Sequence, residues 1–205
     1  MYSTFRKTLS PDHTTNLKAI PNRQRAMLRK ALAGGLFGES VPGDNGVKRL
    51  YRVYSESVRN LGTPVFAIRY LRELKKEFGE DCRVLMIKQS AESTALSDSN
   101  DAALCASTPN TDHVASSDVA GVMSFYFRDE VLPYYGGSVS RAREIKGANH
   151  FMYWDLMRRS VDEGLEIFDF GRSKAGSGPY SFKSNFGFEP TQLYYEYFLV
   201  RDKAP

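Results

Sequence analysis

Glycine residues divide this chain of 205 residues into short segments whose apolar residues repeat at helix or strand spacing. Helical spacing extends from Lys48 to Asn60 and from Ile68 to Phe78. Gly62 and Gly79 stand just after these segments, where glycine commonly ends a helix. Five shorter segments are rich in β-branched and aromatic residues and predict strands: 83–88, 121–127, 131–135, 166–170 and 194–200. This order of elements predicts a mixed α/β domain of the α+β type.

A further helix is predicted after residue 148. Asn149 is a favoured N-cap, and Gly164 follows the last apolar residue of a one-sided pattern formed by Phe151, Trp154, Met157 and Val161. A basic helix is expected from Pro21 to Ala33, and a helix of one or two turns from Tyr180 to Asn185.

Two parts are expected along the chain. Residues 1–46 form a basic lead-in segment with one helix, in which Gly38–Gly46 is a loop, and residues 47–205 form the main domain. Within that domain, Gln89–Asp118 is crowded with small polar residues and has no aromatic residue. Such a segment cannot bury enough apolar area to order itself, so we expect a mobile insertion between two strands.

Composition excludes several classes of protein. Hydrophobic residues at 41% and charged residues at 25% are ordinary for a soluble globular protein. No apolar run is long enough to span a membrane, and the N-terminus lacks the apolar core of a signal peptide. Two cysteines and three histidines predict neither a disulfide framework nor a metal site. We therefore expect a cytoplasmic protein without a metal.

Basic residues are concentrated near the N-terminus. Residues 6–30 contain seven lysines and arginines and one acidic residue, Asp12. This charge suits contact with phosphate, nucleotide or tRNA. The alternative, a solvated helix or arm, is favoured because no aromatic residues for base stacking accompany the charge.

The loop within "FDFGRSKAGSGPYSFKSNFGF" (168–188) is the principal candidate site. Gly171 and Gly176 have the separation of a nucleotide-triphosphatase loop, but Ser177 and Gly178 stand where Lys-Ser/Thr is required. A dinucleotide fingerprint is also excluded, because no long helix follows. The small residues still allow backbone N–H groups to approach a ligand, and Arg172 and Lys174 add positive charge around Ser173. A plain strand-to-helix turn is the alternative.

Charged side chains beside this loop suit acyl transfer. Lys183 follows Phe182 where the loop re-enters ordered structure, so its ammonium can face a developing oxyanion; otherwise it is a surface lysine. Asp169 alternates with two phenylalanines in a strand, so it is either a general base or, as we favour, a partner of Arg172 or Lys183.

A second anion-binding feature is expected upstream. Tyr135, Gly136 and Gly137 end one predicted strand, and Asn149 begins the following helix. A helix N-terminus has free N–H groups and a dipole that favours anions, so it suits an acyl carrier's phosphate; a simple helix cap is the alternative.

Four segments together resemble FemAB-like proteins, most closely the subgroup associated with exosortase and PEP-CTERM systems in bacteria that export polysaccharide. These segments are "SVRNLGTPVF" (57–66), "SFYFRDEVLPYYGGS" (124–138), "ANHFMYWDLMRRS" (148–160) and "FDFGRSKAGSGPYSFKSNFGFEP" (168–190). The subgroup belongs to the GNAT-like N-acyltransferases. The resemblance implies a mixed, largely antiparallel sheet flanked by helices, with a V-shaped opening between strands 131–135 and 166–170 that holds the acyl donor.

The resemblance also implies a chemistry. The donor would be acyl-CoA or aminoacyl-tRNA, with no tightly bound cofactor, and the acceptor an amine of a cell-envelope or exopolysaccharide-related precursor. In Fem ligases a lysine in a Phe-Lys pair before a Phe-Gly turn is implicated in transition-state stabilisation, a pattern that Lys183 matches. Asp169, Tyr135 or Tyr180 would handle protons, and the donor would contact Gly136, Gly137, Asn149 and the loop residues Gly171, Arg172, Ser173, Lys174, Gly176 and Gly178.

Two departures from the family pattern create an alternative. Family members usually carry two tandem GNAT-like halves, whereas this sequence matches only the second half and its lead-in. The acetyltransferase pyrophosphate motif is absent between Gly136 and Asn149. The chain is therefore either an acyl- or aminoacyltransferase or a non-catalytic subunit that pairs with a second GNAT-like half, with itself or with another assembly protein.

Overall fold

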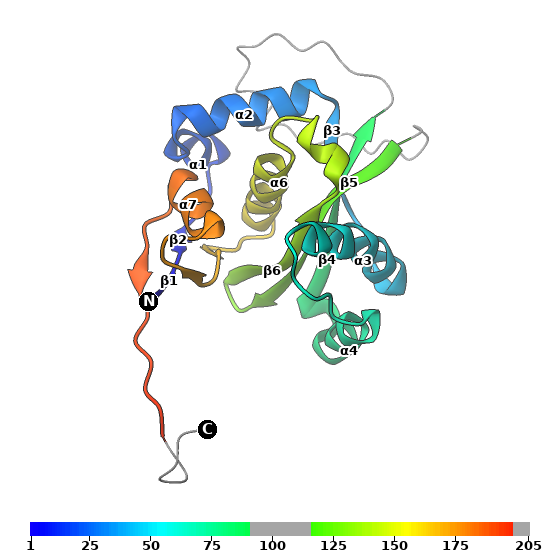
Figure 1. Cartoon of the computed structure of the whole chain (residues 1–205). Helices are drawn as coiled ribbons and strands as arrows, with labels where there is room; N and C mark the ends of the chain where they lie inside the picture. The colour runs from blue at the N-terminus through cyan, green and yellow to red at the C-terminus, as the bar shows by residue number, and fades with distance from the viewer. Residues whose placement is uncertain (91–115, 199–205) are drawn as a thin grey trace.

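A computed structural model describes residues 1–90 and 116–198. Its main feature is a six-stranded sheet in the order β2-β7-β6-β5-β4-β3 (Figure 1). The strands β4 (Cys82–Ser90), β5 (Ser116–Phe127) and β6 (Glu130–Ser138) form an antiparallel meander, and β3 (Leu36–Ser40) pairs antiparallel with β4. The sheet is mixed and largely antiparallel, as predicted.

The parallel pair at the other side of the sheet diverges. The strand β7 (Ile167–Asp169) pairs with β6 only at Glu130↔Ile167 and Val131↔Phe168, and beyond these pairs the two strands separate. The N-terminal strand β2 (Arg6–Thr8) then covers the outer edge of β7. An opening is thus created between the carboxyl ends of β6 and β7.

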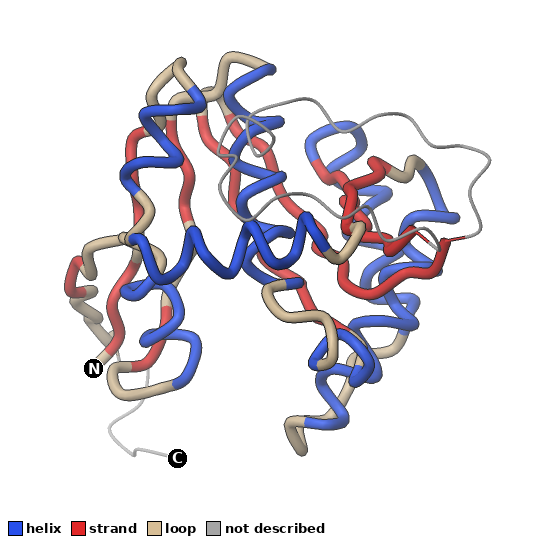
Figure 2. Tube along the Cα trace, turned by 90° about the horizontal axis from the view of Figure 1, so that it is seen from above, coloured by secondary structure: helices blue, strands red, loops and turns tan. Residues whose placement is uncertain are grey.

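Helices cover both faces of the sheet (Figures 1 and 2). Because side chains alternate along β4, Leu85 and Ile87 face one core cluster and Val84 and Met86 face the other. The helices α3 (Gly43–Asn60) and α4 (Ile68–Phe78) cover the second cluster. The helix α6 (Ala148–Asp162) covers the first, and α2 (Asn22–Ala33) packs against α6.

Smaller elements complete the described chain. They are α1 (His13–Ala19), the 3-10 turns η1 (Gly79–Asp81) and η2 (Ser140–Arg143), α7 (Gly178–Asn185), and a small sheet of β8 (Ser173–Lys174), β1 (Tyr2–Thr4) and β9 (Thr191–Gln192) in that order. Among the described residues, no helix is long and apolar enough to cross a membrane.

The N-terminal segment differs from its prediction. Residues 1–46 contain two complete helices, three strands and the start of α3, where one helix was expected, and two of the strands belong to the main sheet. The predicted loop Gly38–Gly46 is wrong, because it includes the end of β3 and the first turn of α3. That first turn is polar until Val47, so its sequence has no helical periodicity.

Other boundaries also move. Asn149 is not the N-cap of α6, because Gly147 holds that position with a φ of +93°, a conformation that favours glycine. Gly136 and Gly137 lie inside β6 rather than ending it. No strand forms at 194–198, the described part of the predicted C-terminal strand. Of the predicted insertion Gln89–Asp118, both ends belong to β4 and β5, and residues 91–115 lie outside the described residues.

Candidate functional site

A cavity of about 270 Å³ lies in the opening between β6 and β7. Three helices, one strand and the residue after β7 form its walls. They are Ser57 of α3, Gly136, Gly137 and Ser138 of β6, Asn149, Met152 and Tyr153 of α6, Phe170, and Gly178, Pro179, Phe182 and Lys183 of α7. The cavity therefore joins the two regions that the sequence identified separately.

Gly137 allows β6 to approach α3 beside this cavity. A Cβ atom at Gly137 would lie 2.7 Å from Ser57 Cβ and 3.0 Å from its Oγ atom, closer than side-chain carbons normally approach. At Gly136 the nearest atom would be 3.4 Å away, an ordinary contact. The close approach of strand and helix therefore depends on the second glycine of the pair.

The N-terminus of α6 meets the same cavity. Asn149 is the second residue of this 15-residue helix, and the first turn contains no acidic residue. The first N–H groups of an α-helix have no partner within the helix, and the helix dipole makes this end favourable for anions. A negatively charged part of a ligand in the cavity would be stabilised here.

Lys183 supplies a positive charge to the wall of the cavity. Its Nζ atom donates to the carbonyl oxygens of Phe170 at 2.6 Å, Gly171 at 3.0 Å and Arg172 at 3.3 Å. Burial lowers the pKa of Lys183 to about 8, and the charge of Asp169 partly opposes this change. The ammonium form still predominates at neutral pH, and it links α7 to the chain that leaves β7.

Aromatic rings form the apolar side of the cavity. The ring of Tyr153 contacts Phe170 at a centroid distance of 4.7 Å and Phe182 at 5.7 Å. Burial raises the pKa of the Tyr153 phenol to about 12, so it stays a neutral hydrogen-bond donor at physiological pH. No prediction from the sequence placed Tyr153 at a site, because its place in the cavity wall depends on how α6 packs beside Phe170 and Phe182.

Asp169 lies outside the lining of the cavity. Its Oδ1 atom accepts from the backbone N–H of Gly171 at 2.7 Å and from Thr4 Oγ1 at 3.4 Å, and its Oδ2 atom lies 3.6 Å from Arg6 Nε. Of the two roles predicted for it, these contacts resemble the partner role, although its partners are Arg6 and the loop rather than Arg172 or Lys183.

The two predicted tyrosines also lie outside the lining. Tyr135 points towards α3 and α4, where its hydroxyl lies 3.0 Å from that of Tyr70, and burial raises its pKa. Tyr180 packs edge-on against Phe5 at 5.1 Å. Lys183 lies three residues later on the same helix, with its Nζ atom 5.6 Å from the centroid of the Phe5 ring.

Most of the predicted loop residues lie outside the lining of the cavity. Of this loop, Gly178 lines it, whereas the other predicted donor-binding residues, Gly171, Arg172, Ser173, Lys174 and Gly176, do not. Gly171 and Gly176 have φ values of +67° and +78° and turn the chain on either side of β8. The exposed Arg172 guanidinium lies over the ring of Tyr2.

Several basic residues of segment 6–30 form ion pairs or hydrogen bonds with other residues of the chain. Arg6 pairs with Glu130, Lys7 donates to the carbonyl oxygen of Gly187 at 3.3 Å, and Arg25 donates to that of Lys18 at 2.9 Å. These contacts account for part of the positive charge. Within the described ranges, no cluster of three or more His, Cys, Asp or Glu side chains could hold a metal ion.

Comparisons with known proteins bear on this geometry. Residues 113–184 match the family described as an acetyltransferase (GNAT) domain. No curated protein matches the chain. A crystal structure of FemX superposes with a TM-score of 0.73 at 16% identity, over 92% of this chain and 59% of FemX.

Two lipid-related structures are also similar. The C-terminal domain of a putative lysylphosphatidylglycerol synthetase from Agrobacterium fabrum gives a TM-score of 0.55 at 15% identity, over 92% of this chain and 58% of that one. L-PGS from Bacillus licheniformis gives 0.55 at 14% identity, over 93% and 59%. The chain thus spans less than two thirds of these structures. It has a GNAT-like fold shared with FemX, and the matches support an acyl- or aminoacyltransferase.

Proposed function

We propose that this chain is a FemAB-type N-acyltransferase or aminoacyltransferase whose donor binds in the cavity between β6 and β7. The observation that carries the proposal is the position of Lys183, whose ammonium is held by three backbone carbonyl oxygens, in the wall of a cavity that also contains a helix N-terminus. A donor whose acyl group is attached to a phosphate-containing carrier needs both features. The ammonium would lie near the reacting carbonyl, and the helix N-terminus would lie near the carrier's phosphate.

The reaction would proceed by direct attack. The nitrogen of a neutral acceptor amine forms a bond to the donor's carbonyl carbon, and the carbonyl oxygen becomes an oxyanion near Lys183. Collapse of this intermediate breaks the C–S bond of a thioester or the C–O bond of an aminoacyl ester. The nitrogen loses a proton, and the thiolate or alkoxide leaving group gains one. Tyr153, a neutral phenol beside Phe170 and Phe182, can orient the donor carbonyl in the same cavity.

The donor class follows from the chemistry of the cavity and the resemblance. Acyl-CoA and aminoacyl-tRNA both place a reactive carbonyl at the end of a phosphate-containing carrier. The acceptor would be an amine of a cell-envelope or exopolysaccharide-related precursor, consistent with the exosortase/PEP-CTERM-associated subgroup. Both donors belong to the cytoplasm, which is where we place the reaction. Residues 6–30 would contact tRNA through basic side chains other than Arg6, Lys7 and Arg25, which contact other residues of the chain.

Titration of the purified chain tests the donor. Saturable heat on addition of acetyl-CoA supports an acyl-CoA enzyme, whereas binding of charged tRNA that weakens steeply with salt supports aminoacyl transfer, because phosphate contacts release counterions. A Lys183→Met variant that binds the donor but no longer transfers the acyl group would support the proposed mechanism. Unchanged transfer by that variant would contradict it.

A second candidate is a non-catalytic subunit that pairs with a separate GNAT-like half. It is favoured by exposed aromatic side chains on α4 and β6: Tyr70, Phe78 and Tyr134. Absence of binding to both donors, together with a native mass above that of a single chain, would favour this candidate. A monomer that binds a donor would count against it.

A further inference from the structure

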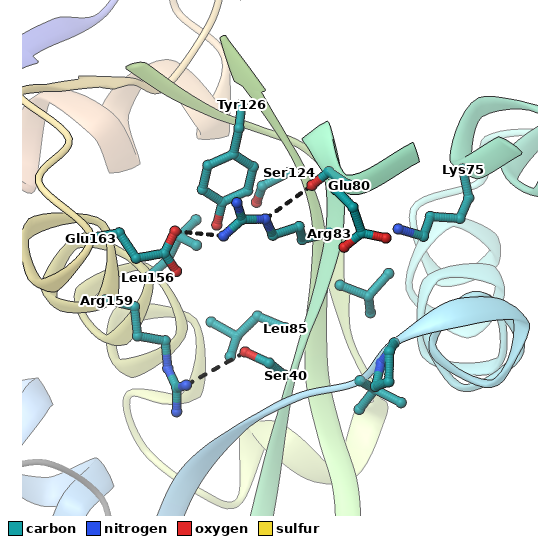
Figure 3. A pocket seen from close by; sticks show the side chains of 13 residues that line it. Ser40, Lys75, Glu80, Arg83, Leu85, Ser124, Tyr126, Leu156, Arg159 and Glu163 are labelled. Carbon is teal, nitrogen blue, oxygen red and sulfur yellow. Dashed lines mark hydrogen bonds and ion pairs between the residues drawn. The ribbon is translucent and has the colours of Figure 1, made fainter. Parts of the chain in front are cut away.

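A second cavity, of about 420 Å³, lies at the far end of α6. Asn149, Met152 and Tyr153 of α6 line the first cavity. Leu156 and Arg159 of α6 and Glu163, the residue after it, line the second. Its other walls come from the end of β3 and the two residues after it, from α4 and η1, from the start of β4 and from the last residues of β5. Figure 3 shows Arg83 and Glu163 on one side of the open space and Arg159 and Ser40 on the other. The volume is within the usual range for small-molecule sites.

A buried polar group in this cavity lacks a partner. Ser124 lines the cavity and is 1% exposed, and its Oγ atom has no hydrogen-bond partner among the described residues. A buried hydroxyl without a partner destabilises the fold, because it has given up its hydrogen bonds to water. The position lies on β5 between Val122 and Tyr126, where an apolar side chain would pack without that cost. A ligand atom that accepts or donates a hydrogen bond would remove the penalty.

The charge of the lining favours an anion. Three cationic side chains, Lys75, Arg83 and Arg159, face two carboxylates, Glu80 and Glu163, which leaves one net positive charge. Arg83 Nη1 donates to Glu163 at 2.5 Å, so that pair is neutral. Arg159 binds Asp155, and Asp155 also binds Arg158, so the formal charges of these three side chains sum to one positive charge.

The remaining walls are apolar and limit the body of the ligand. Val41, Pro42, Leu85 and Leu156 enclose the space between the charged groups. We propose that this cavity is a second binding site, for a small organic carboxylate with a short apolar body that lies between Arg83 and Arg159 and reaches the Ser124 hydroxyl. The site is separate from the acyl-donor cavity and does not depend on the function proposed for it.

The test uses butyrate, 3-hydroxybutyrate and benzoate as probes, with 1-butanol and benzyl alcohol as their neutral counterparts. Binding to the full chain is followed by NMR at constant ionic strength. Saturable shifts confined to residues around Ser124 and Leu156, several-fold stronger for the carboxylates than for the alcohols, are expected. Failure of all three carboxylates to saturate in the millimolar range, or equal binding of acids and alcohols, would overturn the proposal.

Charge variants give opposite expected changes. Arg83→Gln should weaken carboxylate binding about tenfold and Glu163→Gln should strengthen it, because the lining loses or gains net positive charge. Ser124→Ala should weaken binding without lowering the unfolding free energy. Arg69→Gln, whose side chain on α4 is 87% exposed, is the matched control and should change nothing. Weakening by both Arg83→Gln and Glu163→Gln would show a structural effect and contradict the site.

Discussion

The Nζ atom of Lys183 lies 2.6 Å from the carbonyl oxygen of Phe170, the residue that immediately follows β7. This bond and the longer ones to Gly171 and Arg172 hold an ammonium at the point where β7 has separated from β6. Carbonyl oxygens orient the ammonium but, unlike a carboxylate, do not neutralise its charge. Under the proposed function, this positive charge would stabilise a developing oxyanion in the cavity.

Replacement of this lysine should mainly affect the chemical step. We expect Lys183→Met to lower kcat about 10²–10³-fold, the usual effect of losing an oxyanion-stabilising group, with a much smaller change in donor affinity. Single-turnover rates and donor titrations on the same preparation measure the two quantities. Lys76→Met, at an exposed position of α4, is the control. Equal losses in affinity and in kcat would instead indicate that Lys183 only holds the loop.

The pH dependence of the rate should report the same group. Burial lowers the pKa of Lys183 from its ordinary value of 10.5 to about 8, so the ammonium form of this side chain is lost as pH rises through about 8. We expect kcat to fall above that pH once the acceptor amine is saturating. Lys183→Met should lack this descending limb while keeping any ascending limb due to the amine. A wild-type profile that stays level beyond pH 9 would contradict a requirement for the ammonium.

The sequence predicts the elements that have strong periodicity. The helices α3, α4 and α6 each carry an apolar face, and their bounds were predicted to within five residues, as were those of β4 to β7. The strand β2 was missed because it has no apolar residue: Arg6, Lys7 and Thr8 form a strand only because β7 offers an unpaired edge. Such a strand is determined by tertiary contacts, which local periodicity does not record.

Only part of the candidate site could be predicted, because the rest also depends on tertiary contacts. Gly136, Gly137, Asn149, Gly178 and Lys183 meet at the predicted opening between β6 and β7. Ser57 begins the segment 57–66 that contributes to the resemblance, but it was not predicted as a site residue, because its position in the cavity depends on the packing of α3 against β6.

The contact between Gly137 and Ser57 gives a further prediction. Gly137→Ala should lower the unfolding free energy by about 1–3 kcal/mol and weaken donor binding, because its Cβ atom would push β6 away from α3. Gly136→Ala has room and should have a smaller effect. The double variant Gly137→Ala with Ser57→Gly should recover most of the loss, which urea unfolding and donor titration would show. If Ser57→Gly gives no recovery, the clash is not the cause.

The buried carboxylate of Asp155 should be among the most sensitive positions for stability. Asp155 is 1% exposed, and its two oxygens accept from Arg158 Nη2 and Arg159 Nε, each at 2.7 Å. Asp155→Asn keeps the shape but leaves two neighbouring guanidinium groups without their shared carboxylate. We expect the unfolding free energy to fall by about 3–5 kcal/mol, the usual cost of removing one partner from a buried ion pair. Urea unfolding at neutral pH measures this change, with Asp81→Asn at an exposed position as the control. A loss no larger than that of the control would mean that the two arginines are held in place by other contacts.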